Sequence, residues 1–399
     1  MPIEKRGPNS FRLIVEAGYD ANNKRIQRKK TINVDDKLLK TPKKLRDYLE
    51  LELAKFKIEI EAGEYIAPEK MAFINFVEEW KAKYAEKELA PTTLKNYLGL
   101  LNTHILPVFG CKRLDQIKTF HIVSFLDELS KPGARKDGRG ETLSGGTLES
   151  IYRVLKNIFN RCVDWKIIKD NPMNGVRKPR PEKRKMKYYE EQEAEEVITN
   201  LYKEPDVWRL YFLGAMLGGF RRGELLGLEW SNVSFEDNTL DIQKSISLTV
   251  KGQAVVSKPK TEDSEGIVVM PEWYMQELKN YQTQWEKDKV LVDDKWIGGD
   301  NQYVFHNGLG KPFHYTTPSH RWIKFRRRYN LKEIRLHDLR HTAATLLIEA
   351  GADLKAIQER LRHSRYQTTA DTYIHITKKI NKDTAEKLDK FNPRKKEIK

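Results

Sequence analysis

Five residues in the second half of the chain have side chains that could cleave a phosphodiester bond without a metal ion. They are two arginines, two histidines and a tyrosine, at Arg221, His337, Arg340, His363 and Tyr373. A guanidinium group stays charged at any working pH and donates two parallel hydrogen bonds to phosphate oxygens. A tyrosine hydroxyl can attack phosphorus and form a covalent intermediate, while histidine can transfer protons. In a basic chain, these are the parts needed to break a DNA strand through a phosphotyrosine.

Each of these residues has an ordinary explanation when it is taken alone. Arg221 could lie in a surface turn, and His363 could cap a helix. Tyr373 is one of 17 tyrosines, and a tyrosine is usually a packing residue. His337 and Arg340 are three residues apart, so they share a face if that stretch is helical. Only the combination and its order point to phosphodiester chemistry.

The charge of the chain predicts a polyanionic partner. The 73 lysine and arginine residues exceed the 57 aspartate and glutamate residues, which leaves a formal net charge of +16 in 399 residues. Nucleic acid and an anionic membrane surface both fit such an excess. We favour double-stranded DNA in a cytoplasm. No apolar run approaches the length of a membrane span, and no charged-then-apolar signal peptide opens the chain, so a membrane partner is not expected.

The cysteine count and the loops give no sign of a metal ion or a cofactor. Cys111 and Cys162 are the only cysteines, so the chain cannot build a disulfide scaffold or a thiolate metal site from cysteine. The sequence also lacks a glycine-rich nucleotide loop of the Gly-x4-Gly-Lys-Ser/Thr type. We expect neither a metal nor a cofactor, and ATP is not implied.

The amino-terminal segment predicts a small sheet followed by one helix. Residues 10–34 predict a basic two-stranded hairpin, because apolar and polar residues alternate beside a turn, and an apolar stripe predicts a helix from Pro42 to about Gly63. A two-stranded ribbon fits the major groove of DNA, whereas the alternative is a solvated basic hairpin; these residues alone support both equally. If the hairpin binds DNA, the candidate contacts are Arg25, Arg28 and Lys29.

An all-helical domain and a basic linker are expected next. Apolar residues recur at helical spacing over residues 72–174, interrupted by a loop rich in glycine, lysine and arginine at 131–146. A basic run with two prolines then extends from Arg177 to Lys187. Such a run is more often a solvated tether, but this one joins two candidate DNA-binding domains, so we favour contact with phosphates. The candidate contacts are Arg177, Lys178, Arg180, Lys183, Arg184 and Lys185.

The remaining residues predict a mainly α domain with a small inserted sheet. The expected elements are helices at 190–201 and 207–218, strands at 240–248, 254–257 and 267–270, and a helix, turn and helix at 342–361. The expected fold class is therefore multidomain and mainly α with small β-sheets. It comprises an α+β amino-terminal module, an all-α domain and a mixed, mainly α carboxyl-terminal domain.

The ordered motifs resemble the catalytic signature of the tyrosine recombinase (phage integrase) family. The resemblance rests on Phe-Arg-Arg-Gly-Glu-Leu around Arg221, the His-x-x-Arg box of His337 and Arg340, Leu-Arg-His-Ser around His363, and Asp-Thr-Tyr at Tyr373. Arg222 is the less favoured alternative to Arg221. The full set is highly specific, whereas each piece is ordinary.

A candidate for the family lysine adds to the resemblance, whereas two other positions depart from the family pattern. The family lysine lies in a β-hairpin turn, and Lys260 in Ser-Lys-Pro-Lys-Thr is similar to it, with Lys258 as a close competitor. Phe220 stands where leucine is common, and Arg362 stands where glycine is common. Neither departure removes a reacting group, and Arg362 could add a phosphate contact.

The resemblance implies an arrangement of domains on DNA. Residues 1–66 resemble an arm-site DNA-binding domain, and residues 70–176 resemble the helical core-site DNA-binding domain. Residues 177–188 form the basic interdomain linker, which would cross the duplex. Residues 189–399 resemble the catalytic domain with a carboxyl-terminal tail, which in the family often packs on a neighbouring protomer.

The resemblance also implies a mechanism. Tyr373 would attack the scissile phosphate, Lys260 would protonate the leaving 5′ hydroxyl, and His337 would assist proton transfer. The negative charge on the phosphate would be stabilised by Arg221, Arg340 and His363. The 3′-phosphotyrosyl bond conserves energy, so a partner strand can reverse the step without ATP.

The implied function is integration or excision of a mobile element, carried by a phage or a conjugative transposon in a bacterial host. Two strand exchanges through a Holliday junction would need a homotetramer on DNA, with contacts at core and arm sites. An accessory DNA-bending or excision factor usually sets the direction.

Two other functions use the same sequence features. A type IB topoisomerase would need the same side chains, but it needs no arm-binding module and does not exchange partner strands. A transcription factor could use residues 342–363 as a helix-turn-helix, which would explain the charge. It would not explain why Arg221, Arg340, His363 and Tyr373 occur in the family order.

Overall fold

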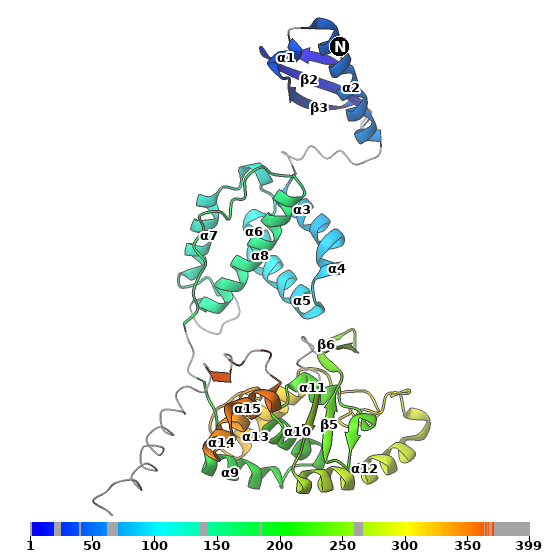
Figure 1. The fold of residues 1–399 in the computed structure, drawn as a ribbon, viewed down its shortest axis with the longest axis vertical. Helices are drawn as coiled ribbons and strands as arrows, with labels where there is room; N and C mark the ends of the chain where they lie inside the picture. The colour runs from blue at the N-terminus through cyan, green and yellow to red at the C-terminus, as the bar shows by residue number, and fades with distance from the viewer. Residues whose placement is uncertain are drawn as a thin grey trace, which may run out of the picture. The chain divides into compact units, whose positions relative to one another are not determined.

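The chain is mainly helical and carries three small antiparallel sheets within the described ranges (Figure 1). The computed structural model describes residues 2–19, 25–39, 41–61, 71–135, 142–182, 186–258, 266–362, 364, 366 and 369–370. The chain divides into two compact units, residues 1–183 and 184–399. The expected fold class, mainly α with small sheets, is confirmed. Across the described part of the chain, no helix has both the length and the apolar composition needed to cross a bilayer.

A three-stranded sheet and one long helix form the amino-terminal module. Phe11, Leu13 and Val15 alternate along β2 and are buried, and they pack with Leu49 and Phe56 of α2. The predicted hairpin and helix are therefore confirmed. The strand β1, which pairs with β2, escapes prediction because three residues with one apolar side chain carry no alternation signal. The elements are β1 (Ile3–Lys5), β2 (Ser10–Tyr19), β3 (Arg25–Asn33), α1 (Asp36–Leu39) and α2 (Pro42–Glu61).

An all-helical domain with its own core follows, as predicted. Trp80 is fully buried, and its indole Nε1 donates a hydrogen bond to Asn157 Oδ1 at 2.9 Å, which joins the first helix of the domain to the last. Phe73 packs against Phe159 with ring centroids 5.6 Å apart. The helices are α3 (Phe73–Trp80), α4 (Glu86–Glu88), α5 (Pro91–Leu100), α6 (Leu106–Phe109), α7 (Thr119–Ser130) and α8 (Gly145–Asp164).

The second unit packs helices around two small sheets. The strands β4, β5 and β8 form one sheet in that order, and β6 and β7 form a separate hairpin. The helices are α9 (Glu191–Leu201), α10 (Asp206–Leu217), α11 (Arg222–Leu226), α12 (Glu272–Val292), α13 (Thr317–Arg328), α14 (Asp338–Glu349) and α15 (Leu354–Leu361). The strands are β4 (Val233–Ser234), β5 (Thr239–Ile242), β6 (Ser245–Val250), β7 (Gln253–Ser257) and β8 (Gly266–Val269).

The prediction of one strand at 240–248 is wrong in one respect. This segment forms two strands, and they belong to different sheets. Ile242 ends β5 and Ser245 begins β6. Alternation would place residue 244 on the buried face, but Lys244 directs its ammonium to Glu229 Oε1 at 2.8 Å. The chain therefore leaves the first sheet between Ile242 and Ser245. The apolar pattern resumes at the same parity in β6, which is why it looked continuous.

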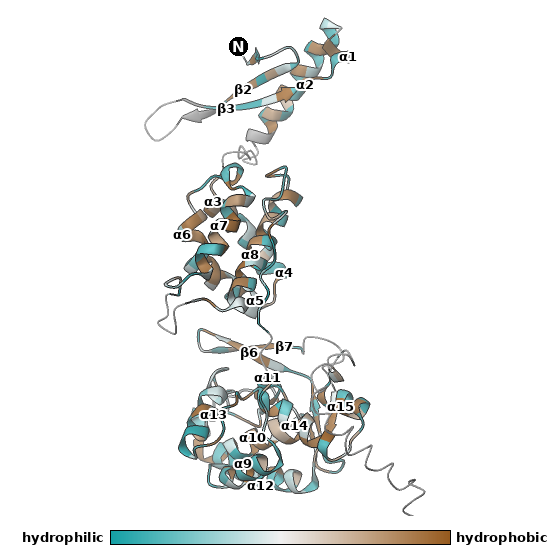
Figure 2. Cartoon of the chain, turned by 90° about the vertical axis from the view of Figure 1, so that its left-hand side faces the viewer, coloured by the Kyte–Doolittle hydropathy of each residue, from teal (hydrophilic) through white to brown (hydrophobic). Residues whose placement is uncertain are grey.

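The helix α10 is the centre of the second unit. Every residue from Leu210 to Met216 is buried, and α10 packs with α9, α12 and α14 (Figure 2). Trp208 and Phe212 stack at one end with ring centroids 5.9 Å apart. A helix held on several sides by a packed core cannot shift without loss of contacts. The residues just beyond its end are therefore held in place.

Candidate active site and DNA interface

The turn after α10 presents the first candidate arginine. Gly219 has a φ of +64°, a conformation that glycine adopts without strain. A Cβ at this position would lie 2.5 Å from Leu361 Cδ2, so any side chain here would also have to displace the buried Leu361 side chain. Arg221 is the N-cap residue of α11, with extended backbone angles. The short helix α11 thus begins directly beside the candidate side chain.

Arg221 is held by the buried carboxylate of Glu224. The backbone N–H of Arg221 donates to Glu224 Oε2 at 2.9 Å, and its Nη1 donates to Oε1 at 2.7 Å. The Arg221 side chain remains 37% exposed, whereas that of Glu224 is 2% exposed. Burial raises the pKa of Glu224, but the charges of Arg362 and Arg221 and the hydrogen bonds from Arg221 outweigh it, so the pKa is lowered. Glu224 therefore stays ionised and orients Arg221 while part of the guanidinium faces solvent.

The neighbouring arginine turns to different partners. Arg222 Nη1 donates to Ser319 Oγ at 3.0 Å, and its guanidinium lies over the Tyr315 ring, 5.5 Å from the centroid. Arg221 instead lies close enough to His337 for its charge to lower the pKa of that residue. The geometry therefore supports Arg221 over Arg222 as the member of the candidate site.

Arg340 connects three segments of the second unit. It lies in α14 and is 2% exposed. Its Nη1 donates to the backbone carbonyl of Gly219 at 2.6 Å, and its Nη2 donates to the carbonyl of Leu361. The guanidinium thus joins the turn that presents Arg221 to the end of α15. Arg340 is thereby bonded to the backbone two residues before Arg221.

His337 lies at the N-cap of α14 with a second histidine beside it. The rings of His337 and His341 are 5.6 Å apart. Although His337 is an exposed residue, the groups packed around its ring desolvate it and lower its pKa, and the charge of Arg340 lowers it further. Burial, followed by the charge of His337, lowers the pKa of His341 to about 4. Both rings are therefore neutral at neutral pH, and a neutral imidazole can accept a proton.

Arg362, which stands where glycine is common in the family, is the residue that ends α15. Arg362 has φ 51° and ψ 52°, a left-handed conformation that costs roughly 1–2 kcal/mol for a residue with a Cβ. Its side chain turns inward, where Nη2 donates to Glu224 Oε2 at 2.5 Å, and the residue is 5% exposed. The expected phosphate contact of Arg362 is therefore wrong, because its guanidinium is buried against an acid.

Three candidate catalytic residues lie outside the described residues. They are Lys260, His363 and Tyr373. The competing Lys258 is described and is exposed just after β7. Sequence reasoning also missed Glu224 and His341. The four-residue spacing of His341 from His337 was a signal for the second of these, since it places both rings on one helical face.

The register of the amino-terminal sheet separates the candidate DNA contacts onto two faces. Residues directly opposite each other in an antiparallel pair share a face. Arg28 is opposite the buried Val15, so it lies on the face that packs on α2. Lys29 is opposite Ile14, on the open face. The side chain of Arg25, the third candidate contact, lies outside the described residues.

Sequence reasoning missed one cation on the open face. Arg12 alternates with the buried Phe11 and Leu13 along β2, so its side chain is on the same face as Lys29. The period of two along a strand was a sufficient signal. The open face therefore presents Arg12 and Lys29.

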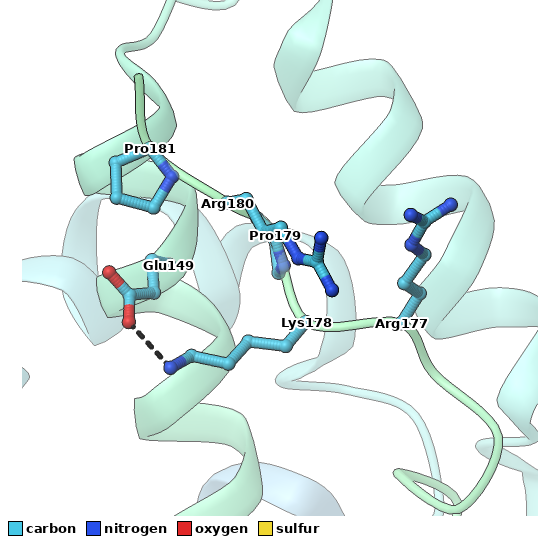
Figure 3. A pocket seen from close by; sticks show the side chains of 6 residues that line it. All are labelled: Glu149, Arg177, Lys178, Pro179, Arg180 and Pro181. Carbon is cyan, nitrogen blue, oxygen red and sulfur yellow. Dashed lines mark ion pairs between the residues drawn. The ribbon is translucent and has the colours of Figure 1, made fainter. Parts of the chain in front are cut away.

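The first part of the linker packs on α8. A Cβ at Gly145 would lie 3.0 Å from Pro181 Cα, so the linker approaches the start of the helix closely. Lys178 Nζ pairs with Glu149 Oε1 at 2.8 Å, whereas Arg177 and Arg180 are exposed (Figure 3). Glu149 also pairs with Arg153 Nη2 at 2.5 Å, and the Lys178 side chain is 54% exposed, so all three cations of this part face solvent. The other candidate linker contacts, Lys183, Arg184 and Lys185, lie outside the described residues.

Comparisons with known proteins identify related chains. Residues 187–379 match the phage integrase family, and residues 72–130 match the phage integrase N-terminal SAM-like domain. The ICEBs1 integrase of Bacillus subtilis (strain 168) is 26% identical over 397 residues, which cover 98% of this chain and 99% of that protein.

Solved structures share the fold. The Tn1549 transposon integrase in complex with transposon right end DNA has a TM-score of 0.63 at 18% identity, covering 80% of this chain and 99% of that one. A lambda integrase tetramer bound to a Holliday junction has a TM-score of 0.53 at 16% identity, covering 91% and 96%. With the two matched regions and the motifs that carry Arg221 and Arg340, these likenesses show that the chain belongs to the phage integrase family of tyrosine recombinases, enzymes that break and rejoin DNA.

Proposed function

We propose that this chain is a site-specific recombinase that integrates or excises a mobile DNA element. It cleaves strands through a 3′-phosphotyrosyl intermediate and exchanges them through a Holliday junction. One observation carries the proposal: Arg340 donates to the carbonyl of Gly219, 121 residues earlier, and thereby joins the turn of Arg221 to α14. Two guanidinium groups brought together in this way fit the two non-bridging oxygens of a phosphate.

The proposed roles follow from the chemistry of each group. Tyr373 is the nucleophile, and Lys260 protonates the leaving 5′ hydroxyl. His337, whose lowered pKa keeps it neutral, takes part in proton transfer. Charge on the phosphate is stabilised by Arg221, Arg340 and His363. Phosphoryl transfer of this kind depends mainly on positioning and charge stabilisation.

The proposed domains divide the work of DNA binding. Residues 1–66 bind arm sites, residues 70–176 bind the core site, and residues 189–399 carry catalysis and the tail that packs on a neighbouring protomer. The linker, residues 177–188, contacts phosphates through its basic side chains, of which Arg177, Lys178 and Arg180 are exposed. The open face of the sheet supports the arm-site role, because it presents the cations Arg12 and Lys29, which can contact DNA.

The two faces of the sheet give a prediction with an internal control. Lys29→Ala is expected to weaken binding to arm-site DNA about tenfold, the loss of one good contact in the groove. Arg28→Ala removes the same charge from the opposite face and is expected to change the affinity less than about threefold. Anisotropy titrations of the full chain on DNA from the ends of the element would measure both. If the two variants lose the same affinity for arm-site DNA, binding depends only on net charge, and the sheet does not contact DNA through its open face.

The assembly and setting complete the proposal. A homotetramer on double-stranded DNA performs the two exchanges, and an accessory DNA-bending or excision factor sets the direction. The lambda integrase tetramer on a Holliday junction supports the first point through its shared fold. The likeness to the ICEBs1 integrase and to the integrase of Staphylococcus phage L54a supports a mobile element as the carrier, whether a transposable element or a phage. The site of action is the cytoplasm of a bacterial host.

The test is a covalent trap. DNA spanning the junctions of the element that encodes the chain is nicked next to each candidate scissile phosphate, so that the short cleaved end diffuses away. We expect a denaturation-resistant protein–DNA adduct joined through a 3′ phosphate. Transfer of the trapped strand to added partner DNA would separate a recombinase from a topoisomerase. Tight binding to verified junction DNA without any adduct would contradict the proposal and favour a regulator.

A further inference from the structure

The left-handed residue at the end of α15 is an arginine where glycine would fit without strain. Helices commonly end with a residue in this conformation, usually glycine. Arg362 adopts it with φ 51° and ψ 52°. Its guanidinium lies over the Phe220 ring, 5.1 Å from the centroid, and reaches Glu224 across 138 residues of sequence. The strained backbone thus places a buried cation beside the acid that holds Arg221.

Glu224 divides its oxygens between two arginines. Oε1 accepts from Arg221 Nη1, whereas Oε2 accepts from Arg362 Nη2 and from the backbone N–H of Arg221. Both Glu224 and Arg362 are at most 3% exposed in their side chains. A buried carboxylate with one cation removed would be left with uncompensated charge. The guanidinium of Arg221 is the nearest group able to compensate for it.

The end of α15 is also held by bonds that do not involve Arg362. Arg360 donates to the carbonyl of Leu217 at 3.0 Å and to that of Val269 at 3.0 Å, and Arg340 holds the carbonyl of Leu361. These bonds attach the end of α15 to α10, β8 and α14. The separate contribution of Arg362 is therefore to the charge balance at Glu224.

We propose that Arg362 is a positioning residue that acts through Glu224 on Arg221. By occupying Oε2, it leaves Arg221 bound through one side-chain nitrogen, so that the remaining N–H donors of that guanidinium face the scissile phosphate. Without Arg362, both carboxylate oxygens compete for Arg221 and draw it away from the phosphate. This inference rests on the proposed recombinase function.

Two substitutions separate positioning from stability. Arg362→Gly removes the cation and relieves the left-handed strain, whereas Arg362→Lys keeps a positive charge in a strained backbone. We expect the glycine variant to form the covalent adduct about 10- to 100-fold more slowly at saturating protein. Because Arg362 acts only through Arg221, this loss should not exceed the loss caused by removing a group that donates directly to the phosphate. Its Kd for junction DNA should change less than about threefold. The lysine variant should cleave faster than the glycine variant without having a higher Tm.

The control is an arginine–glutamate pair that shares no residue with the candidate site. Arg328 at the end of α13 pairs with Glu204 at 2.5 Å, but its side chain is 58% exposed. Arg328→Gly should cleave like the wild type. If Arg362→Gly forms the adduct at the wild-type rate, the inference about Arg362 is wrong but the recombinase function stands. The same holds if the rates of the wild type, Arg362→Gly and Arg362→Lys simply follow their Tm values. Failure of the wild type to form any adduct on verified junction DNA would overturn the recombinase function, and the inference with it.

Discussion

Tyr373→Phe is expected to abolish the covalent adduct while leaving DNA binding unchanged. Phenylalanine retains the ring but lacks the oxygen that attacks phosphorus, so no covalent intermediate can form. The loss should exceed about 10⁴-fold and fall below detection, because the reaction has no alternative first step. Denaturing gels of the nicked junction DNA would measure the adduct, and anisotropy would measure binding.

A second tyrosine provides the control for this substitution. Tyr366 is seven positions earlier in the sequence and is 48% exposed. Tyr366→Phe removes the same hydroxyl from an accessible position in the same segment and should form the adduct at the wild-type rate. An adduct that persists in Tyr373→Phe and disappears in Tyr366→Phe would move the nucleophile to residue 366.

Arg340→Lys is expected to lower the rate of adduct formation about 10²- to 10³-fold. Lysine keeps the charge but not the planar fork, so it cannot hold the Gly219 carbonyl and also place two donors on a phosphate. A loss of this size is typical when one donor to the developing charge is removed. Single-turnover assays at saturating protein would measure it.

Stability must be separated from catalysis for this buried residue. Removing its fork leaves the carbonyls of Gly219 and Leu361 without their donor, which costs about 1–3 kcal/mol each when buried. Arg326 is a matched control, since it is 7% exposed and also donates to a backbone carbonyl, that of Lys332. Arg326→Lys should lower the Tm with little effect on cleavage at a permissive temperature. If both variants lose the same fraction of activity per degree of Tm, Arg340 has a structural role only.

Local patterns predicted most of the fold. Alternation along β2 predicted the hairpin, and apolar spacing predicted α2, α8 and α10, because each pattern lies within one element. The break between β5 and β6 could not be predicted in the same way. It depends on the partner that Lys244 finds in Glu229, 15 residues away.

Residues of the candidate site were predictable where a motif is contiguous. Arg221 and Arg340 could be selected because their neighbours in sequence resemble the family motifs. The role of Glu224 depends on Arg362, and nothing near either residue reveals the other. The inward turn of Arg362 could not be foreseen either, because an arginine near a phosphate site is usually expected to bind the phosphate. Pairings between distant segments require the tertiary structure.

The arginines that join α14 and α15 to the turn after α10 also determine when the site can assemble during synthesis. Gly219 and Leu217 receive their donors from residues 121 and 143 positions later, so these bonds cannot form while that part of the chain is still untranslated. Such contacts of high sequence separation form late, because loop closure must precede them. A nascent chain that already carries its amino-terminal sheet and helical domain therefore still lacks the bonds that join α14 and α15 to the turn after α10. Ribosome stalling before residue 340 would produce a fragment that keeps the first compact unit but leaves the carbonyls of Gly219 and Leu217 without these donors.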